Sequence, residues 1–146
     1  MHNVLFVCIH NSARSQMAEA FLNKLGAGLF VAESAGIDSG TLNPLVVRSM
    51  QDIGIDMSAH YAKTVASIVE KGKTYDAVIT VCDAANAERC PVFPGNTKRI
   101  AWYFSDPSAL AGTEAEKLQN IAIIRDEIKD QIAAFITEAG APGYWG

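Results

Sequence analysis

Residues 4–21, VLFVCIHNSARSQMAEAF, decide the fold because two different patterns meet within them. Residues 4–9 form a short apolar run, which is typical of a buried β-strand. From residue 14 to residue 25, apolar side chains recur at the three- and four-residue spacing of one helix face. We therefore predict a strand and a helix joined by a loop, with Cys8 where the loop begins and Arg14 where it ends.

The rest of the chain repeats this alternation of apolar runs and amphipathic stretches. Further strands are predicted at residues 29–33, 76–82 and 97–103, a loop at residues 34–36, and further helices at residues 44–51, 64–70 and 113–139. Such alternation predicts an α/β fold, namely a four-stranded parallel sheet flanked by helices on both faces. At 146 residues the chain is expected to form a single domain, residues 1–146.

The charge and the cysteine content of the sequence argue against several classes of protein. The sequence carries 12 basic and 16 acidic residues, and the basic residues form no dense run, which argues against a nucleic-acid partner. The apolar run at residues 4–9 is too short for a membrane span, and no Lys or Arg precedes it as in a signal peptide. Three cysteines are too few for a secreted disulfide framework. We therefore expect a cytoplasmic monomer without a membrane partner.

The loop between the first strand and the first helix has the features of an anion site. In a parallel sheet, ligands bind at the carboxyl ends of the strands, where Cys8, Cys82 and Asp106 all fall. Unpaired amides at a helix start favour an anion, and an arginine adds a two-point contact. The same donors favour the thiolate form of a cysteine. The predicted oxyanion-binding residues are Ile9, His10, Asn11, Ser12, Ala13, Arg14 and Ser15.

Taken singly, these residues also fit a buried cysteine that closes a strand and a surface arginine that opens a helix. The combination of a strand, Cys-x5-Arg-Ser and a helix favours the anion site. This combination resembles the phosphate loop of the low-molecular-weight protein tyrosine phosphatase superfamily, and it is most similar to the thioredoxin-coupled arsenate reductases of that superfamily. The phosphatases usually have glycine and proline where this chain has His10 and Gln16. The resemblance implies that Asn11 braces the loop and that Ser15 donates a hydrogen bond to the Cys8 thiolate, with His10 in a local role at the rim.

Two further cysteines lie in the segment VITVCDAANAERCPVFPG, as Cys82 and Cys90. A zinc site has weak support because the three histidines lie at no familiar ligand spacing, and the pair alone could be inert core thiols. The segment resembles the redox segment of the reductases. Eight helical residues rise about 12 Å, whereas a disulfide needs Cα atoms within about 7 Å. If residues 83–89 are helical in the reduced protein, formation of a Cys82–Cys90 disulfide must therefore unwind that helix, because the two cysteines would otherwise lie too far apart.

Two more expectations rest on the resemblance. Asp106, in WYFSDPS, could be an ordinary turn residue, but an aspartate-proline pair near this point provides the general acid of the superfamily. Glu19 and Ser34, together with Asn11, resemble positions around a stabilising potassium ion in some reductases. The segment MSAHYAKTV departs from the pattern expected for the remaining potassium ligands. No other metal is predicted.

The resemblance implies the reduction of arsenate to arsenite by a thiol relay. Cys8 attacks arsenic, Cys82 attacks Cys8 and releases arsenite, and Cys90 then attacks Cys82. Thioredoxin or a similar thiol donor reduces the final Cys82–Cys90 disulfide, and no organic cofactor is bound.

Two other functions remain open at this point. A phosphatase of the same fold would use Cys8, Arg14 and Asp106 and would need neither of the later cysteines. A phosphocarrier or oxyanion-binding module would hold an anion without turnover.

Overall fold

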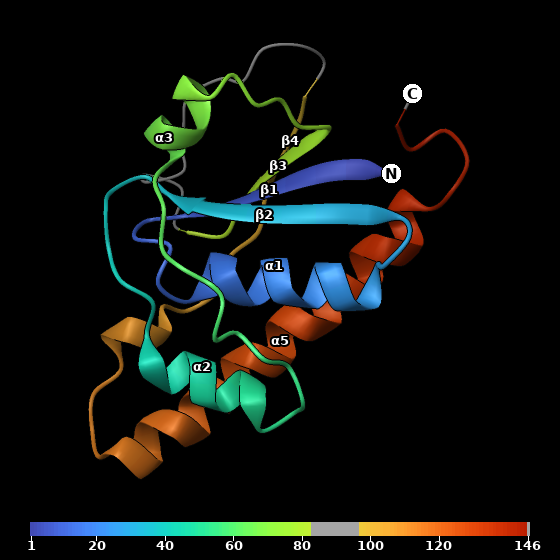
Figure 1. Cartoon of the computed structure of the whole chain (residues 1–146). Helices are drawn as coiled ribbons and strands as arrows, with labels where there is room; N and C mark the ends of the chain where they lie inside the picture. Colours follow the sequence, from blue (N-terminus) through green and yellow to red (C-terminus); the bar gives the residue numbers. More distant parts are fainter. Residues whose placement is uncertain (83–96, 146) are drawn as a thin grey trace.

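The sheet is built from four parallel strands in the order β2-β1-β3-β4 (Figure 1). The computed structural model describes residues 1–82 and 97–145. Its strands are β1 (His2–Cys8), β2 (Phe30–Gly36), β3 (Ala77–Thr80) and β4 (Lys98–Ala101). Its helices are α1 (Arg14–Leu25), α2 (Pro44–Gln51), α3 (Val65–Glu70) and α5 (Glu114–Ala139), with a 3₁₀ turn η1 (Pro107–Ala109).

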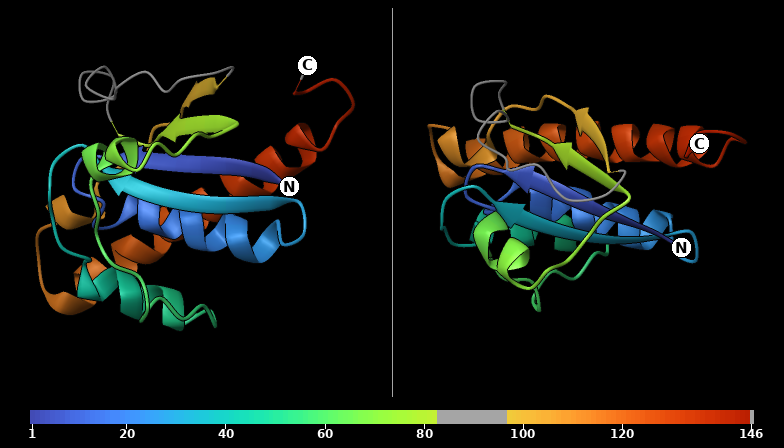
Figure 2. Two further views of the ribbon diagram at one scale, coloured as in Figure 1. Left: turned by 45° about the horizontal axis from the view of Figure 1, so that its top comes forward. Right: turned by 90° about the horizontal axis from the view of Figure 1, so that it is seen from above.

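Helices lie on both faces of the sheet, which confirms the predicted fold class. Helices α1, α2 and α5 lie on one side of the sheet and α3 lies on the other (Figures 1 and 2). Strand β1 contributes side chains to the hydrophobic cores on both faces of the sheet, because successive side chains of a strand point to opposite faces. Val4 and Phe6 join the core under α1 and α5, whereas Leu5 and Val7 join the core under α3. All four side chains are fully buried, so the apolar run at residues 4–9 indicates a central strand.

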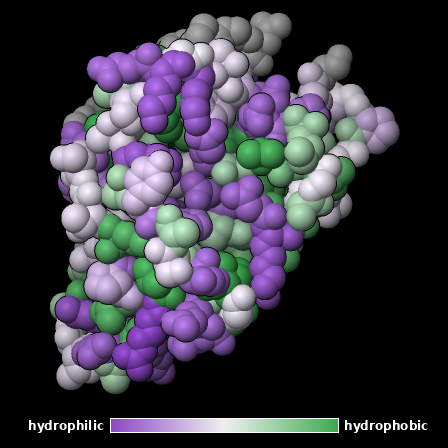
Figure 3. Space-filling model, in the orientation of Figure 1, coloured by the Kyte–Doolittle hydropathy of each residue, from purple (hydrophilic) through white to green (hydrophobic). Residues whose placement is uncertain are grey.

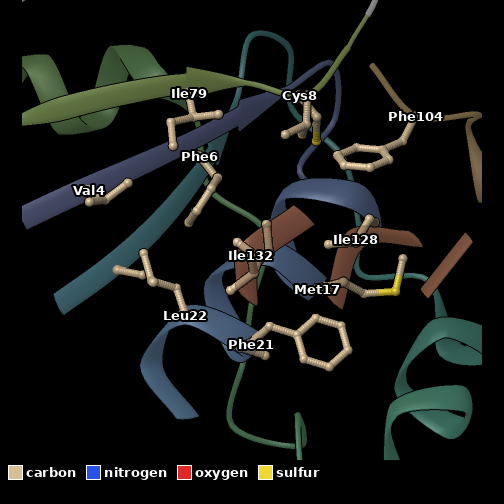
Figure 4. Packing of buried hydrophobic residues seen from close by; sticks show 14 of the residues in the cluster. Val4, Phe6, Cys8, Met17, Phe21, Leu22, Ile79, Phe104, Ile128 and Ile132 are labelled. Atoms are coloured by element: carbon tan, nitrogen blue, oxygen red, sulfur yellow. The ribbon is translucent and has the colours of Figure 1, made fainter. Parts of the chain in front are cut away.

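The larger core reaches up to the end of β1. Figure 4 shows Cys8 at the edge of this cluster, with the ring of Phe104 beside it and Met17 and Ile128 on the helices below. Cys8 is 3% exposed, and Met17 and Ile128 are fully buried. The packed residues therefore fix the position at which the following loop starts.

Most element boundaries agree with the local sequence signals. Helices α1 and α2 have the predicted bounds. Thr113 caps α5, as the sequence predicts, whereas Thr64 was predicted as the first residue of its helix and is an N-cap instead. Each side chain accepts a hydrogen bond from a backbone N–H in the first turn. Strands β3 and β4 are shorter than predicted. Residues 83–89, which were considered only as a conditional helix, lie outside the described residues.

The prediction of a loop at residues 34–36 was wrong. These residues extend β2 to Gly36 and pair in register with residues 6–8 of β1. Their small side chains give a weak strand signal, but the ladder satisfies their buried backbone groups. The longer strand brings Gly36 level with Cys8.

The surface mixes polar and apolar residues. Figure 3 shows hydrophilic residues interspersed with hydrophobic ones on the face seen in Figure 1. Among the described residues, no helix has the length and apolar character needed to cross a membrane.

Candidate active site

The thiol of Cys8 is held by two hydrogen-bond donors from the loop of residues 8–15, termed the thiol loop below. The backbone N–H of Asn11 donates to Cys8 Sγ at 3.1 Å, and Ser15 Oγ lies 2.8 Å from the same sulfur. Ser15 Oγ also accepts a hydrogen bond from Asn11 Nδ2 at 2.8 Å, so its own hydrogen is available to the sulfur. Asn11 adopts a left-handed backbone conformation, with φ of 55°. Both donors therefore point at the sulfur atom that would act as the nucleophile.

The peptide groups of the thiol loop are oriented from outside. The carbonyl oxygens of Cys8, Ile9 and Ser12 accept backbone hydrogen bonds of 2.8–3.0 Å from residues 37–43. In a trans peptide the N–H points opposite to the carbonyl, so the N–H groups that follow point away from that segment. These N–H groups belong to Ile9, His10 and Ala13. The arrangement leaves them available to an anion held within the loop.

Two glycines permit this close approach. A Cβ on Gly36 would lie 2.7 Å from Asn11 N and from His10 C, and one on Gly40 would lie 2.6 Å from His10 O. All these atoms are backbone and cannot move aside as a flexible side chain can. Neither glycine has a recognisable role in the sequence, because neither belongs to a motif and both act through residues distant in sequence.

Gly36→Ala is expected to displace the thiol loop and weaken its binding of inorganic phosphate. The added methyl group would have to push the loop backbone away from β2, with a loss of about 1–3 kcal/mol in unfolding free energy. Phosphate protection of Cys8 against alkylation, together with thermal unfolding, measures both effects. Gly140→Ala is the matched control, because its Cβ would meet only carbonyl oxygens at the end of α5, the nearest at 3.1 Å. Unchanged phosphate protection in Gly36→Ala would contradict the role assigned to this contact.

Arg14 and Asp106 face each other at the mouth of the thiol loop. Arg14 is 6% exposed, and its Nη1 donates to the carbonyl oxygen of Phe104 at 3.1 Å. Its Nη2 lies 3.8 Å from Asp106 Oδ2. The other oxygen of Asp106 accepts a hydrogen bond from Ser108 N at 2.9 Å, which caps η1. Both side chains line a pocket of about 390 Å³, whose wall also includes the exposed Tyr103.

His10 and Ser12 lie on the rim of the loop. His10 Nδ1 is 3.2 Å from the carbonyl oxygen of Ser39 in an exposed setting. Ser12 Oγ lies 3.4 Å from Ser108 Oγ, which also accepts a hydrogen bond from Asn43 at 3.1 Å. These contacts tie the rim to the turn that carries Asp106.

Cys82 lies at the same end of the sheet as Cys8. Strands β1 and β3 pair with Val7 opposite Thr80, and Val81 N donates to Val7 O at 2.8 Å. Cys82 follows directly and is 2% exposed. Cys90 lies outside the described residues.

Below the thiol loop lies a polar network in which Gln16 and His60 join residues that were expected around a potassium ion. Gln16 is fully buried, and its Nε2 donates to Asn11 Oδ1 and to the carbonyl oxygen of Tyr61, both at 2.9 Å. Gln16 Oε1 lies 2.9 Å from His60 Nδ1. The sequence signal for this network was Gln16 itself, because the phosphatases usually have proline at this position and a proline has no side-chain amide. Glu19 and Ser34 are in contact here, with Ser34 Oγ donating to Glu19 Oε1 at 3.0 Å.

No three His, Cys, Asp or Glu side chains gather as a metal site within residues 1–82 and 97–145. The described polar groups around Cys8 are instead those of an anion-binding nucleophile: a thiol with two donors, a guanidinium and a carboxyl group. This arrangement can bind a tetrahedral oxyanion, attack its central atom and protonate a departing oxygen.

Comparisons with known proteins point to the same chemistry. The family of low molecular weight phosphotyrosine protein phosphatases matches residues 3–139. The arsenate reductase of Halalkalibacterium halodurans is 38% identical over 133 residues, which are 90% of this chain and 93% of the relative.

Solved structures give the same result. An arsenate reductase in the phosphate binding state superposes with a TM-score of 0.76 at 28% identity and covers 94% of this chain and 98% of its own. A thioredoxin-dependent arsenate reductase of Corynebacterium glutamicum superposes with a TM-score of 0.62 at 25% identity and covers 92% of this chain and 63% of its own.

Proposed function

This chain belongs to the low molecular weight phosphotyrosine protein phosphatase family, and we propose that it reduces arsenate to arsenite through Cys8, Cys82 and Cys90. The relative at 38% identity and the solved structure at TM-score 0.76 are both arsenate reductases. The chain is therefore an oxidoreductase that uses a phosphatase-like loop. The observation that carries the proposal is the convergence of Cys8, Arg14 and Asp106 at one end of the sheet, where buried Cys82 follows the paired strand β3.

The first step is the attack of the Cys8 thiolate on arsenic. Arg14 and the loop amides hold the oxyanion and stabilise the charge that develops on its oxygens. A sulfur–arsenic bond forms and an arsenic–oxygen bond breaks, and Asp106 protonates the departing oxygen so that it leaves as water. Arsenic remains pentavalent in this covalent adduct.

The second step transfers two electrons. The Cys82 thiolate attacks Cys8 Sγ, the sulfur–arsenic bond breaks, and its electron pair stays with arsenic, which leaves as arsenite. The Cys90 thiolate then attacks Cys82 and releases the Cys8 thiolate.

The remaining Cys82–Cys90 disulfide needs a dithiol donor, and thioredoxin is the proposed partner. The thioredoxin-dependent reductase of C. glutamicum supports this assignment. A reducing cytoplasm suits three cysteines that must return to thiols after each cycle. We propose a cytoplasmic monomer, since each step of the relay uses cysteines of one chain.

One assay tests the proposed function. Purified protein is supplied with arsenate, thioredoxin, thioredoxin reductase and NADPH, and arsenite is quantified. Hydrolysis of an aryl phosphate is measured in parallel. Sustained arsenite formation supports the reductase, whereas rapid phosphate ester hydrolysis without arsenite would favour a phosphatase. Anion binding with neither activity would favour an oxyanion-binding module.

A further inference from the structure

The carboxylate of Glu19 lies beneath the thiol loop and has three partners. Ser34 Oγ donates to its Oε1 at 3.0 Å, and Lys63 Nζ lies 3.7 Å from the same oxygen. His60 Nδ1 lies 3.1 Å from Oε2. The side chains of Glu19, His60 and Lys63 are only 13%, 18% and 20% exposed. An ion pair shielded to this extent is screened less by salt than one at the surface.

Lys63 connects this buried carboxylate to the thiol loop through its backbone. Its N–H donates to Asn11 Oδ1 at 3.0 Å, and its carbonyl oxygen accepts from Gly36 N at 2.8 Å. Its ammonium group also lies 5.0 Å from the ring centre of Tyr61, within the range of a cation–π contact. The ammonium therefore anchors a residue whose backbone orients Asn11.

We propose that the Lys63 ammonium is a built-in cation that takes the place of a potassium ion beneath the thiol loop. Lys63 is thereby a positioning residue. Its pairing with Glu19 on α1 fixes the backbone N–H that orients Asn11, and Asn11 directs Ser15 toward Cys8.

The residues present do not fit potassium. Potassium needs several oxygen atoms with free lone pairs directed at one point. Here one oxygen of Glu19 accepts from Ser34 and the other faces His60, while Asn11 Oδ1 already accepts two hydrogen bonds. A second cation would also be repelled by the ammonium beside the carboxylate. The ammonium group of Lys63 thus occupies the place where a potassium ion was expected.

The test compares Lys63→Met with the matched control Lys73→Met. Methionine removes the ammonium but keeps an unbranched stem and the backbone N–H. Lys73 also pairs with a carboxylate, at 3.0 Å from Glu33, but this pair is more exposed and lies outside the network around Asn11. Thermal unfolding and phosphate protection of Cys8 are measured in KCl, NaCl and choline chloride at one ionic strength.

Wild-type protein is expected to give the same Tm and the same phosphate affinity in all three salts. Lys63→Met is expected to lose about 3–6 °C in Tm and to bind phosphate about fivefold more weakly. Lys63→Arg should retain most of the wild-type Tm and most of the phosphate affinity, because it keeps the positive charge. Lys73→Met should resemble the wild type.

Two results would overturn the proposal. The first is a wild-type Tm or phosphate affinity that is higher in KCl than in NaCl and choline chloride. The second is a Lys63→Met protein that matches Lys73→Met in both measurements. The inference deepens the proposed function because it concerns the same loop. Neither readout requires arsenate turnover, so its failure is distinguishable from failure of the reductase proposal.

Discussion

Arg14→Lys is expected to lower kcat/KM for arsenate by about a hundredfold or more, although the positive charge is retained. The two terminal nitrogens of Arg14 act separately, one on the carbonyl oxygen of Phe104 and the other toward Asp106. A lysine has a single nitrogen and cannot present a planar pair of donors to an oxyanion while it stays anchored to Phe104. Initial rates of arsenite formation measure the loss.

One control variant and one further active-site variant accompany this test. Arg48→Lys makes the same change at an exposed ion pair with Glu114, 3.2 Å long, and should leave the rate unchanged. Asp106→Asn keeps the oxygen that caps η1 and should slow adduct formation more than it weakens phosphate binding. If Arg14→Lys and Asp106→Asn both turned over arsenate at nearly the wild-type rate, the chemistry would lie elsewhere.

Cys90→Ser is expected to abolish sustained turnover but not the first one. Reduced protein should release about one arsenite per chain and then stop as a Cys8–Cys82 disulfide, because the third thiol is missing from the series. Peptide mapping by mass spectrometry locates the bond, and arsenite quantification gives the stoichiometry. The loss of steady-state activity should be essentially complete.

The companion variant Cys82→Ser distinguishes the order of the thiols. It should fail to release stoichiometric arsenite, because no neighbouring thiolate can attack the Cys8 adduct within the chain. Any hydrolysis of aryl phosphates should survive both substitutions, since that reaction uses neither Cys82 nor Cys90. Continued thioredoxin-coupled turnover by Cys90→Ser would exclude the three-thiol relay and leave a two-cysteine reductase or an external thiol.

Much of the fold was predictable because its signals are local. Helix α2 begins at Pro44 after a capping Asn43, and α5 begins with a capping box formed by Thr113 and Glu116. Strand β2 was predicted too short, since residues 34–36 become a strand only by pairing with β1. Pairing between strands depends on register, which a short stretch of small residues does not encode.

Some features of the thiol loop were likewise predictable from local sequence, whereas others depend on the tertiary structure. The spacing of Cys8 and Arg14 between a strand and a helix was sufficient to predict an anion site, because helix starts and their unpaired amides follow from neighbouring residues. The supports of the loop come from segments remote in sequence: His60 reaches Gln16 across 44 residues, and Lys63 reaches Asn11 across 52. Only the packed sheet brings these segments together, so the reacting residues were determined by the sequence itself and the contacts that orient them by the tertiary structure.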